Sequence, residues 1–483
     1  MLKRVISLLL ASVISFSCIA CAEQAKKAAD TVAEPETTLD ADTTYPRPNI
    51  EKTDFSGETF MILYPNWGLY VDYFFADEQT GDQMSDAIYK RTTNVEEYLG
   101  IDIDQYMLGS ILDIFPTMQQ VVMSGGDDYQ LVLTHCIQDL GNMMVSGLLL
   151  NWNTIPHISW NPVYWNDKMN ETLSIYDKLY YAASSYMIAD PNAFLFNKQM
   201  VDEYRLSDPY QLVRDGKWTI DTLYEMARTV SADLDGDGKF TVNDLYGLAA
   251  ESDWMLISFM YGCDQYMVKR DETGKVALDI YNDKMLTITQ KLYDLFHGGN
   301  HTYLWHYGAS AESKILMDTG RCLFSVIPLN SSKIYRQSDV DFGILPFPKY
   351  DEHQKEYISN DWSGLMCIPA VAQNTELIGM TCELLAYESL MTTMPAYYDV
   401  LLTGKLARDD ESVEMLNIIF SNIVYDMGMN YFGFDTGFMA LFYMIPFMIG
   451  RDKSTDLASY YSKNEKAANT MINRLFERME DAQ

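Results

Sequence analysis

Along the first third of the globular chain, the spacing of apolar and polar positions alternates between a strand-like and a helix-like pattern. Strand-like patterns occupy residues 58–64, 101–103 and 129–133. Helix-like spacing separates them at residues 83–98 and 115–123. This alternation predicts a βαβα lobe around a mostly parallel sheet. A further strand is expected at 193–196 and a further helix at 254–261.

Residues 218–230 carry a clear helix pattern. Thr219 is placed to cap the first turn, and Leu223, Met226, Ala227 and Val230 recur at helical spacing. Trp218 is expected to pack beneath the start of this helix.

A late apolar stretch covers residues 436–450. It holds fifteen uncharged residues and is interrupted by Pro446. Spanning a bilayer takes about 20 residues, so a buried helix is expected here.

Length and charge narrow the class of protein. A chain of 483 residues has room for two or more hydrophobic cores. Its formal net charge is −33, and 48% of its residues are hydrophobic. This composition indicates a folded acidic protein that does not bind nucleic acid, and it suits a neutral or cationic ligand.

The N-terminus has the pattern of an export signal. Lys3 and Arg4 precede an apolar run at residues 5–17, which is too short to span a membrane. The sequence Cys18-Ile19-Ala20-Cys21 then resembles a bacterial lipobox, with Cys18 where leucine is usual. We therefore expect a signal peptide at residues 1–20 and a lipid on Cys21. An ordinary secreted protein cut near Ala20 is the alternative.

A twelve-residue acidic loop follows the helix at 219–230. Its residues have the ligand order of an EF-hand calcium loop, with Gly238 at the sharp turn and aspartate at position twelve in place of glutamate. A structural calcium ion is expected, and a solvated acidic turn is the alternative. The expected ligands are Asp233, Asp235, Asp237, the carbonyl of Lys239, Thr241 and Asp244.

Several motifs occur together in one order. Residues 191–247 contain an Asn-Ala-Phe-Leu-Phe-Asn-Lys strand end, an Asp-Gly-Lys-Trp-Thr turn and the acidic loop. Residues 342–350 read Phe-Gly-Ile-Leu-Pro-Phe-Pro-Lys-Tyr. With segments 81–89, 383–389 and 408–412, these motifs resemble extracellular solute-binding proteins of bacterial ABC carbohydrate importers, in their Gram-positive lipoprotein branch.

The resemblance implies an α/β chain with the two-lobed type II periplasmic-binding-protein fold. Segments 176–181 and 193–196 would enter the second lobe, 315–326 would return to the first, and 359–370 would make the last crossing. The implied division is signal peptide 1–20, flexible linker 21–54, lobe 1 at 55–185 and 308–363, and lobe 2 at 186–307 and 364–483.

The resemblance also implies a function without catalysis. A monomer tethered to the extracellular face of the cell membrane only by its lipid would close its lobes over a carbohydrate, such as an oligosaccharide. It would then deliver that carbohydrate to the transmembrane subunits of an ABC permease. A surface sugar sensor and a secreted glycan-cleaving enzyme are the alternatives. The enzyme stays open because a catalytic carboxylate pair could lie among the 68 acidic residues.

A sugar-binding cleft needs flat aromatic rings with polar groups between them. Trp67 and Trp362 follow strand-like runs, where ligands of α/β proteins bind. Core packing is the alternative for every aromatic candidate. The candidate ligand-binding residues are Tyr64, Asn66, Trp67, Asp127, Tyr186, Trp254, Trp305, Asp361 and Trp362.

The remaining histidines and cysteines suggest no metal site. His297, His301 and His306 lie close in sequence, but Gly298 and Gly299 between them disfavour a shared helix face. The cysteines of the body are expected to be small buried hydrophobes.

Overall fold

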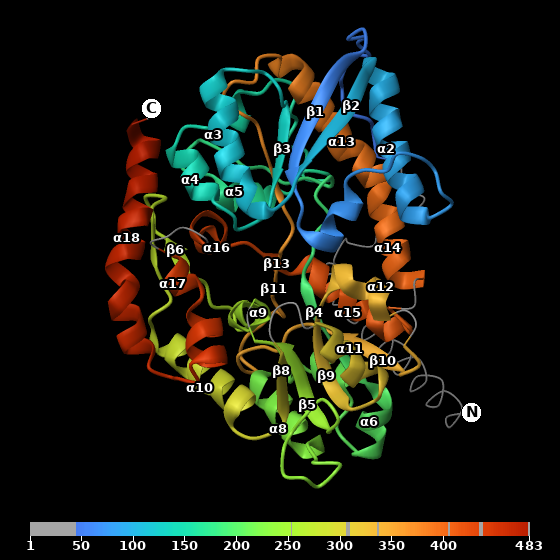
Figure 1. The fold of residues 1–483 in the computed structure, drawn as a ribbon, viewed down its shortest axis with the longest axis vertical. Coiled ribbons are helices and arrows are strands. Elements are labelled where there is room, and N and C mark those ends of the chain that lie inside the picture. Colours follow the sequence, from blue (N-terminus) through green and yellow to red (C-terminus); the bar gives the residue numbers. More distant parts are fainter. Residues whose placement is uncertain are drawn as a thin grey trace, which may run out of the picture. The chain divides into compact units, whose positions relative to one another are not determined.

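The computed structural model describes residues 45–252, 254–305, 310–335, 338–403, 406–433 and 438–481. The predicted signal peptide, Cys21, most of the predicted linker and His306 lie outside these residues. The described chain forms two α/β lobes, each built on its own sheet (Figure 1).

Lobe 1 is built on a four-stranded sheet. Strands β1, β2 and β3 run parallel, and β12 joins antiparallel to β3. The predicted βαβα alternation is therefore confirmed. In spatial order the strands are β12 (Leu365–Cys367), β3 (Leu131–Thr134), β1 (Glu58–Pro65) and β2 (Ile101–Leu108), joined through α2 (Gln83–Leu99) and α3 (Ile114–Ser124).

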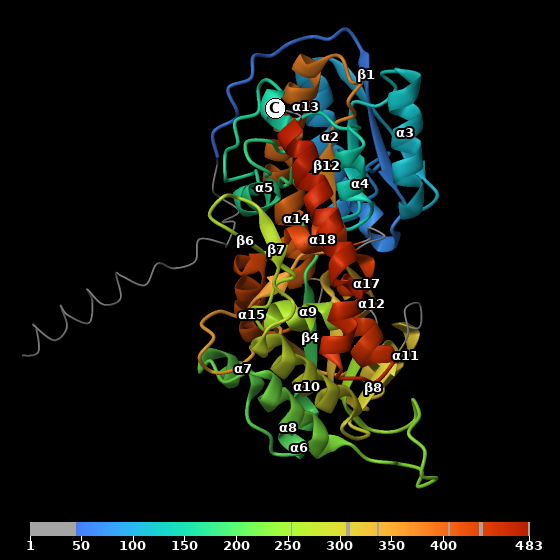
Figure 2. The same ribbon diagram turned by 90° about the vertical axis from the view of Figure 1, so that its left-hand side faces the viewer.

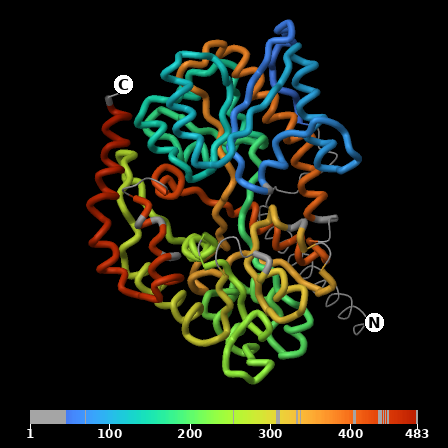
Figure 3. Tube along the Cα trace, in the orientation of Figure 1, coloured from blue at the N-terminus to red at the C-terminus, as the bar shows by residue number. Residues whose placement is uncertain are grey.

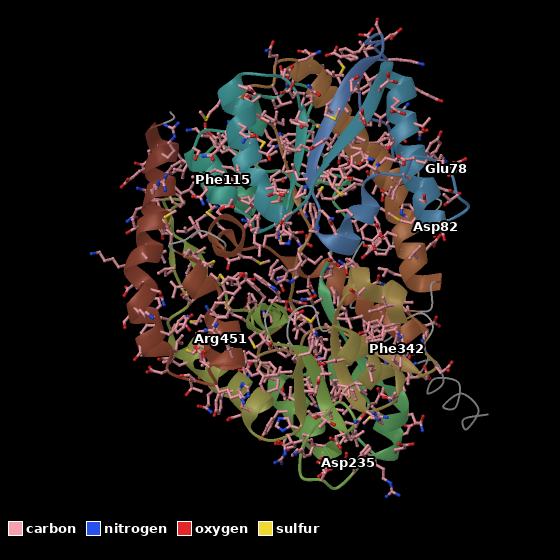
Figure 4. The ribbon with its side chains drawn as sticks, in the orientation of Figure 1. Glu78, Asp82, Phe115, Asp235, Phe342 and Arg451 are labelled. Atoms are coloured by element: carbon pink, nitrogen blue, oxygen red, sulfur yellow. The ribbon has the colours of Figure 1, made fainter. Side chains whose placement is uncertain are left out.

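Helix α2 shows how local sequence sets its ends. The Asp82 side chain accepts hydrogen bonds from the backbone N–H groups of Met84 and Ser85, which satisfies donors that a helix start leaves unpaired. Figure 4 labels Asp82 at this end of the helix. Gly100 ends it in the left-handed conformation, at φ 60°, which glycine adopts without steric cost.

Lobe 2 is built on a five-stranded mixed sheet. Strand β5 runs parallel to β8 and β9, whereas β4 runs antiparallel to β9 and β10. In spatial order the strands are β10 (Phe342–Leu345), β4 (Asn192–Asn197), β9 (Cys322–Pro328), β5 (Tyr246–Glu251) and β8 (Thr302–Trp305), with helices α8 (Ile220–Val230), α9 (Met255–Gly262), α10 (Asp283–His297) and α11 (Ser310–Asp318).

Trp218 anchors the core of lobe 2 below α8. Its side chain is fully buried, and its indole N–H donates to the carbonyl of Pro346 at 2.9 Å. Its ring meets the edge of Phe194 at 6.0 Å. Thr219 accepts the N–H of Thr222 and caps the helix. The predicted packing role and cap are both confirmed.

The lobe assignment of the later segments needs correction. Strands β9 and β10 belong to the lobe 2 sheet, so the prediction that places residues 308–363 in lobe 1 is wrong for these strands. Strand β12 belongs to the lobe 1 sheet, and α13 (Thr375–Met391) and α14 (Thr393–Thr403) pack on α2. The prediction that places all of 364–483 in lobe 2 is therefore wrong for these elements. Figure 3 shows this late part of the chain beside the first strands. A strand pattern reports burial and not the sheet that a strand joins.

Three local predictions also differ from the structure. Residues 315–326 do not return to lobe 1, because they hold the end of α11 and most of β9. Residues 176–181 form a turn with isolated bridges, and Tyr176 has φ 57°. The described part of 436–450 is helical and largely buried, as predicted, and differs only in helix type. It is a short helix followed by a π-helix, because Pro446 lacks the N–H that a regular helix needs.

The last part of the chain packs on both lobes (Figure 2). Its elements are α15 (Asp410–Ser421) against β10, β13 (Ile423–Val424) paired with β11 (Ser359–Asn360), α16 (Met427–Phe432) against α4 (Leu140–Val145), α17 (Met439–Phe442), η5 (Met444–Arg451) and α18 (Leu457–Asp481).

Shorter elements complete the described chain. Cysteines 136, 263, 322, 367 and 382 are buried with free thiols, as predicted. Within the described ranges, no helix is both long and apolar enough to cross a membrane. The remaining elements are η1 (Gly68–Tyr73), η2 (Ile111–Asp113), η3 (Trp152–Thr154), α5 (Asp167–Leu173), α6 (Lys198–Glu203), α7 (Pro209–Arg214), β6 (Val268–Arg270), β7 (Val276–Leu278), η4 (Leu329–Ser331) and α12 (Ser332–Tyr335).

Two buried carboxylates tie together the segments that pass between the lobes. Asp361 accepts the N–H of Asp190 at 2.8 Å and that of Ser363 at 2.9 Å. Asp190 in turn accepts the backbone N–H of Asn330 at 3.0 Å and its side-chain amide at 2.7 Å. Burial raises the pKa of Asp190 to about 7, with the nearby charge of Asp361 adding to this effect and the Asn330 N–H opposing it.

We predict that stability depends on pH through Asp190. Because its pKa is raised in the folded state, its contribution is fully present below the unfolded value of about 3.8 and is lost as pH rises through about 7. The difference in unfolding free energy between the wild type and Asp190→Asn should therefore change by roughly 2–4 kcal/mol between pH 4 and pH 8. Urea unfolding at several pH values measures it. The exposed Asp128→Asn serves as control, and a wild type and Asp190→Asn that respond alike to pH would contradict the prediction.

Candidate functional site

A cavity of about 310 Å³ lies between residues of both lobes. Lobe 1 contributes Ile111, His135 and Ile137. The segment just before β12 contributes Trp362. Lobe 2 contributes Asn192, Glu251, Trp254, Met255 and Pro328.

Strand ends bring these side chains together. His135 directly follows β3, Glu251 is the last residue of β5, and Pro328 is the last residue of β9. Ligands of α/β proteins bind outside the carboxyl ends of strands, and the cavity lies at such ends in both sheets.

Two tryptophans form an aromatic corner in the cavity. The rings of Trp254 and Trp362 lie 6.3 Å apart at 82°. Tyr443 packs against the Trp254 ring at 4.8 Å, and the Trp362 indole N–H donates to Ser258 Oγ at 3.4 Å. These contacts support two flat apolar faces that meet nearly at a right angle.

The polar groups of the cavity are few. Glu251 is 7% exposed, and its Oε1 accepts the N–H of Trp254 at 3.3 Å. The amide nitrogen of Asn192 donates to Ser258 Oγ at 2.9 Å. His135 is half-buried, and its Nδ1 accepts the N–H of Ile137 at 3.4 Å.

His135 is a neutral hydrogen-bonding group. Desolvation by its surroundings lowers its pKa to about 4, so the imidazole is uncharged at neutral pH. Because Nδ1 accepts a hydrogen bond, the neutral ring carries its proton on Nε2. Among the described lining residues, His135 is therefore a neutral hydrogen-bond donor through Nε2, and Glu251 provides the carboxylate.

The acidic loop lies at the far end of lobe 2, where Figure 4 labels Asp235. One carboxylate oxygen from each of Asp233, Asp235 and Asp237 lies within 4.8 Å of the others. The two oxygens of Asp233 accept the N–H groups of Gly236 at 2.7 Å and Gly238 at 2.8 Å. The loop therefore gathers three aspartates in the order expected for a cation site.

The other expected ligands have different partners. The carboxylate of Asp244 accepts the N–H of Thr241 at 2.7 Å and that of Leu234 at 2.9 Å, and these bonds lower its pKa. The Thr241 hydroxyl lies 3.3 Å from the same carboxylate. Asp244 thus closes the loop through backbone bonds, and Lys239 donates its own N–H to Asp237.

Solved structures identify the architecture. An ABC transporter solute-binding protein from Thermotoga lettingae, bound with alpha-D-tagatose, aligns with a TM-score of 0.52 at 15% identity, over 87% of this chain and 100% of that one. The chain has the fold of ABC-transporter solute-binding proteins. The predicted two-lobed type II periplasmic-binding-protein fold is therefore confirmed.

Two further solved structures align similarly. MalE from Listeria monocytogenes, in complex with maltose, gives a TM-score of 0.53 at 14% identity, over 88% of this chain and 99% of that one. UgpB from Mycobacterium tuberculosis, in complex with glycerophosphocholine, gives a TM-score of 0.55 at 14% identity, over 86% of this chain and 98% of that one. No protein-family model and no curated protein matches the sequence. Because these neighbours bind different ligands, the solute-binding-protein fold by itself does not name a ligand.

Three of the nine predicted ligand-binding residues lie in or beside the cavity. Trp254 and Trp362 line it. Trp67 stacks on Tyr70 at 5.3 Å, and its ring lies 6.0 Å from that of His135. Its buried indole N–H has no hydrogen-bond partner among the described residues. A ligand-binding role for all three stays a prediction.

The other six lie outside the lining. Tyr64 is 6% exposed, and its hydroxyl donates a hydrogen bond to Gln105. Tyr186 is 1% exposed and lies beneath the guanidinium of Arg91. The remaining four are distributed over both lobes. Trp305 is buried in β8, Asp361 lies in the segment between the lobes, Asn66 is exposed after β1, and Asp127 accepts a hydrogen bond from Gln130 before β3.

Sequence reasoning missed His135 and Glu251. Both stand at the end of a strand, as the strand-end rule requires. The apolar runs at 131–134 and 246–250 immediately precede them and are the sequence signal that points to these two residues.

Proposed function

We propose that this chain is the substrate-binding protein of an ABC importer and captures a carbohydrate, such as an oligosaccharide, in the cavity between its lobes. The observation that carries the proposal is the aromatic corner of Trp254 and Trp362 beside Glu251 and His135. Sugar rings present apolar C–H faces that pack on indoles, and hydroxyls that bond to carboxylate and imidazole groups. The fold shared with sugar-bound solute-binding proteins supports the same reading.

Capture would follow from the division of the lining between the lobes. His135 and Ile137 belong to lobe 1, whereas Glu251 and Trp254 belong to lobe 2. A ligand touches both sets only when the lobes face each other closely, so its binding free energy favours that arrangement. The permease subunits would then recognise the ligand-loaded form.

A binding role suits the cavity better than glycan cleavage does. Glycoside hydrolysis commonly uses two carboxyl groups that flank the scissile bond. Glu251 is the carboxylate among the described lining residues. A sugar sensor would share this cavity and would differ only in its partner protein.

We also propose that the protein acts as a monomer on the extracellular face of the cell membrane, held there by lipid on Cys21. The supporting observation is the sequence Cys18-Ile19-Ala20-Cys21 after a short apolar run. Acyl chains contribute about 0.8 kcal/mol of membrane affinity for each buried methylene.

A further proposal concerns calcium in the acidic loop. Asp233, Asp235 and Asp237 supply convergent carboxylate oxygens, with Lys239, Thr241 and Asp244 completing the expected set after local rearrangement. A hard cation would neutralise the mutual repulsion of these carboxylates and would stabilise the loop at the edge of lobe 2.

The ligand prediction uses a thermal-shift screen of the protein without its signal peptide, followed by calorimetry. An oligosaccharide at 100 times its dissociation constant should add about 2.7 kcal/mol to the apparent stability. Trp254→Ala and Trp362→Ala should each weaken binding at least tenfold, because each removes a flat apolar face. Trp160→Ala, which changes a tryptophan of lobe 1 that lies outside the lining, should not. Stabilisation by peptides and by no sugar would contradict the carbohydrate assignment.

The calcium prediction compares melting with calcium and with a chelator. Calcium should raise the melting temperature of the wild type, because an ion that binds only the folded state stabilises it. Asp235→Asn should abolish most of the rise, whereas Asp128→Asn should retain it. Equal melting temperatures with calcium and chelator would contradict the proposal.

Lipid attachment to Cys21 is tested by expressing variants of the two leader cysteines in a bacterium that processes lipoproteins. Cys21→Ala should abolish incorporation of labelled palmitate and release the protein from the membrane fraction. Cys18→Ala should preserve both, because the lipid acceptor remains. Membrane retention of Cys21→Ala would exclude lipidation at this residue.

A further inference from the structure

A hairpin and the C-terminal helix bridge the two lobes away from the cavity. Strands β6 and β7 pair antiparallel and project from lobe 2 between α9 and α10. Helix α18 has 25 residues, a length of about 37 Å. Figures 1 and 2 both show α18 running from the lower lobe to the upper one with the hairpin beside it. None of the described residues that line the cavity belongs to these elements.

The hairpin reaches lobe 1 through Arg270, which meets the end of α5. The chain that follows α5 belongs to lobe 1, because the Ala182 N–H donates to the carbonyl of Met366 in β12 at 2.9 Å. The Nη2 of Arg270 donates to the carbonyl oxygen of Thr172 at 2.7 Å and to that of Ser174 at 2.9 Å. These carbonyls stand at the end of α5, where a helix leaves its last acceptors without partners in the helix itself. Hydrogen bonds from a charged donor are stronger than those between neutral groups.

The C-terminal end of α18 also reaches lobe 1. The buried ammonium of Lys178 donates to the carbonyl of Met479 at 2.7 Å. The hydroxyl of Tyr176 donates to Glu480 at 2.8 Å. The Phe476 ring meets the Tyr176 ring edge-on at 6.0 Å.

Glu480 joins all three parts at one oxygen. Its Oε1 accepts from Tyr176 of lobe 1 and pairs with Lys275 of the hairpin at 2.8 Å. The Lys275 and Tyr176 bonds lower the pKa of Glu480, so the carboxylate stays ionised at neutral pH. One side chain of α18 therefore links lobe 1 to an extension of lobe 2.

The other end of α18 is fixed on lobe 2. Tyr461 stacks on Tyr281, with centroids 4.8 Å apart and rings within 13° of parallel. Tyr281 lies just before α10 of lobe 2, and Leu457 at the helix start is fully buried. The helix therefore has one end on each lobe.

We propose that the β6–β7 hairpin and α18 form an interlobe clasp, which favours the arrangement in which both lobes line the cavity and so regulates ligand capture. The effect of the clasp on ligand capture rests on the proposed function, whereas its effect on the position of the lobes does not. Opening would break the bonds of Arg270 and Glu480 to lobe 1. A protein whose competent arrangement is less populated binds its ligand more weakly by the same factor.

The test measures lobe separation without a ligand. Spin labels are placed at Met123→Cys on α3 of lobe 1 and Ile315→Cys on α11 of lobe 2, both exposed, whereas the native cysteines of the described body are buried. Arg270→Ala and Glu480→Gln, made separately in the purified labelled protein, should lengthen the mean distance between the labels in a dipolar electron resonance measurement. Arg228→Ala is the matched control, because Arg228 pairs with Glu225 within α8.

Two variants keep the outcome decisive. If Arg270→Ala does not fold, Glu480→Gln decides, because Glu480 lies near the end of the described chain. Once a sugar is identified, both variants should raise its dissociation constant about three- to tenfold with the cavity residues unchanged. An unchanged label distance in the folded clasp variants would overturn the clasp and leave the proposed function standing. Absence of sugar binding with a lengthened distance would overturn the function alone.

Discussion

The carboxylate of Asp361 holds the passage between the lobes. Segments that leave one sheet before joining the other have amide groups without strand partners, and an unsatisfied buried amide costs about 1–3 kcal/mol. Asp361 accepts two such groups, from Asp190 and Ser363, and Asp190 accepts two bonds from Asn330. Trp362 stands between Asp361 and Ser363, so the same bonds position one wall of the cavity. The link between the lobes and one wall of the cavity thus share a single short segment.

The cavity divides its chemistry unevenly between the lobes. Lobe 1 supplies a neutral imidazole and apolar side chains, whereas lobe 2 supplies Glu251 and Trp254. Neither set encloses a ligand by itself. In the proposed function a ligand would contact the lining of both lobes, and each Å² of apolar area that it removes from water would contribute roughly 25 cal/mol. The proposed clasp lies outside the cavity and would regulate capture without touching the ligand.

Local sequence specified individual elements well. Asp82 and Thr219 mark helix starts because their side chains accept unpaired N–H groups, and such capping patterns are readable in sequence. The two-lobed architecture was predicted from the order of motifs and not from periodicity. Periodicity could not show that β9 and β10 join lobe 2 while β12 joins lobe 1, because strand pairing depends on contacts distant in sequence.

The site was only partly predictable for a similar reason. Tyr186 and Trp305 have the aromatic character of sugar platforms, yet both are buried in packing contacts. An aromatic residue serves a core and a cleft equally well, so residue type does not decide between them. Position in the fold does decide, because His135 and Glu251 reach the cavity from the ends of their strands.

Carbohydrate binding in the interlobe cavity is best tested by native mass spectrometry of the protein after incubation with a mixture of oligosaccharides. We predict one intact oligosaccharide bound per chain, retained by the wild type and lost when Trp254 and Trp362 are both replaced by alanine. Recovery of cleaved sugars would show an enzyme. Retention of the sugar by the double variant would place the binding site elsewhere and contradict the assignment of the interlobe cavity.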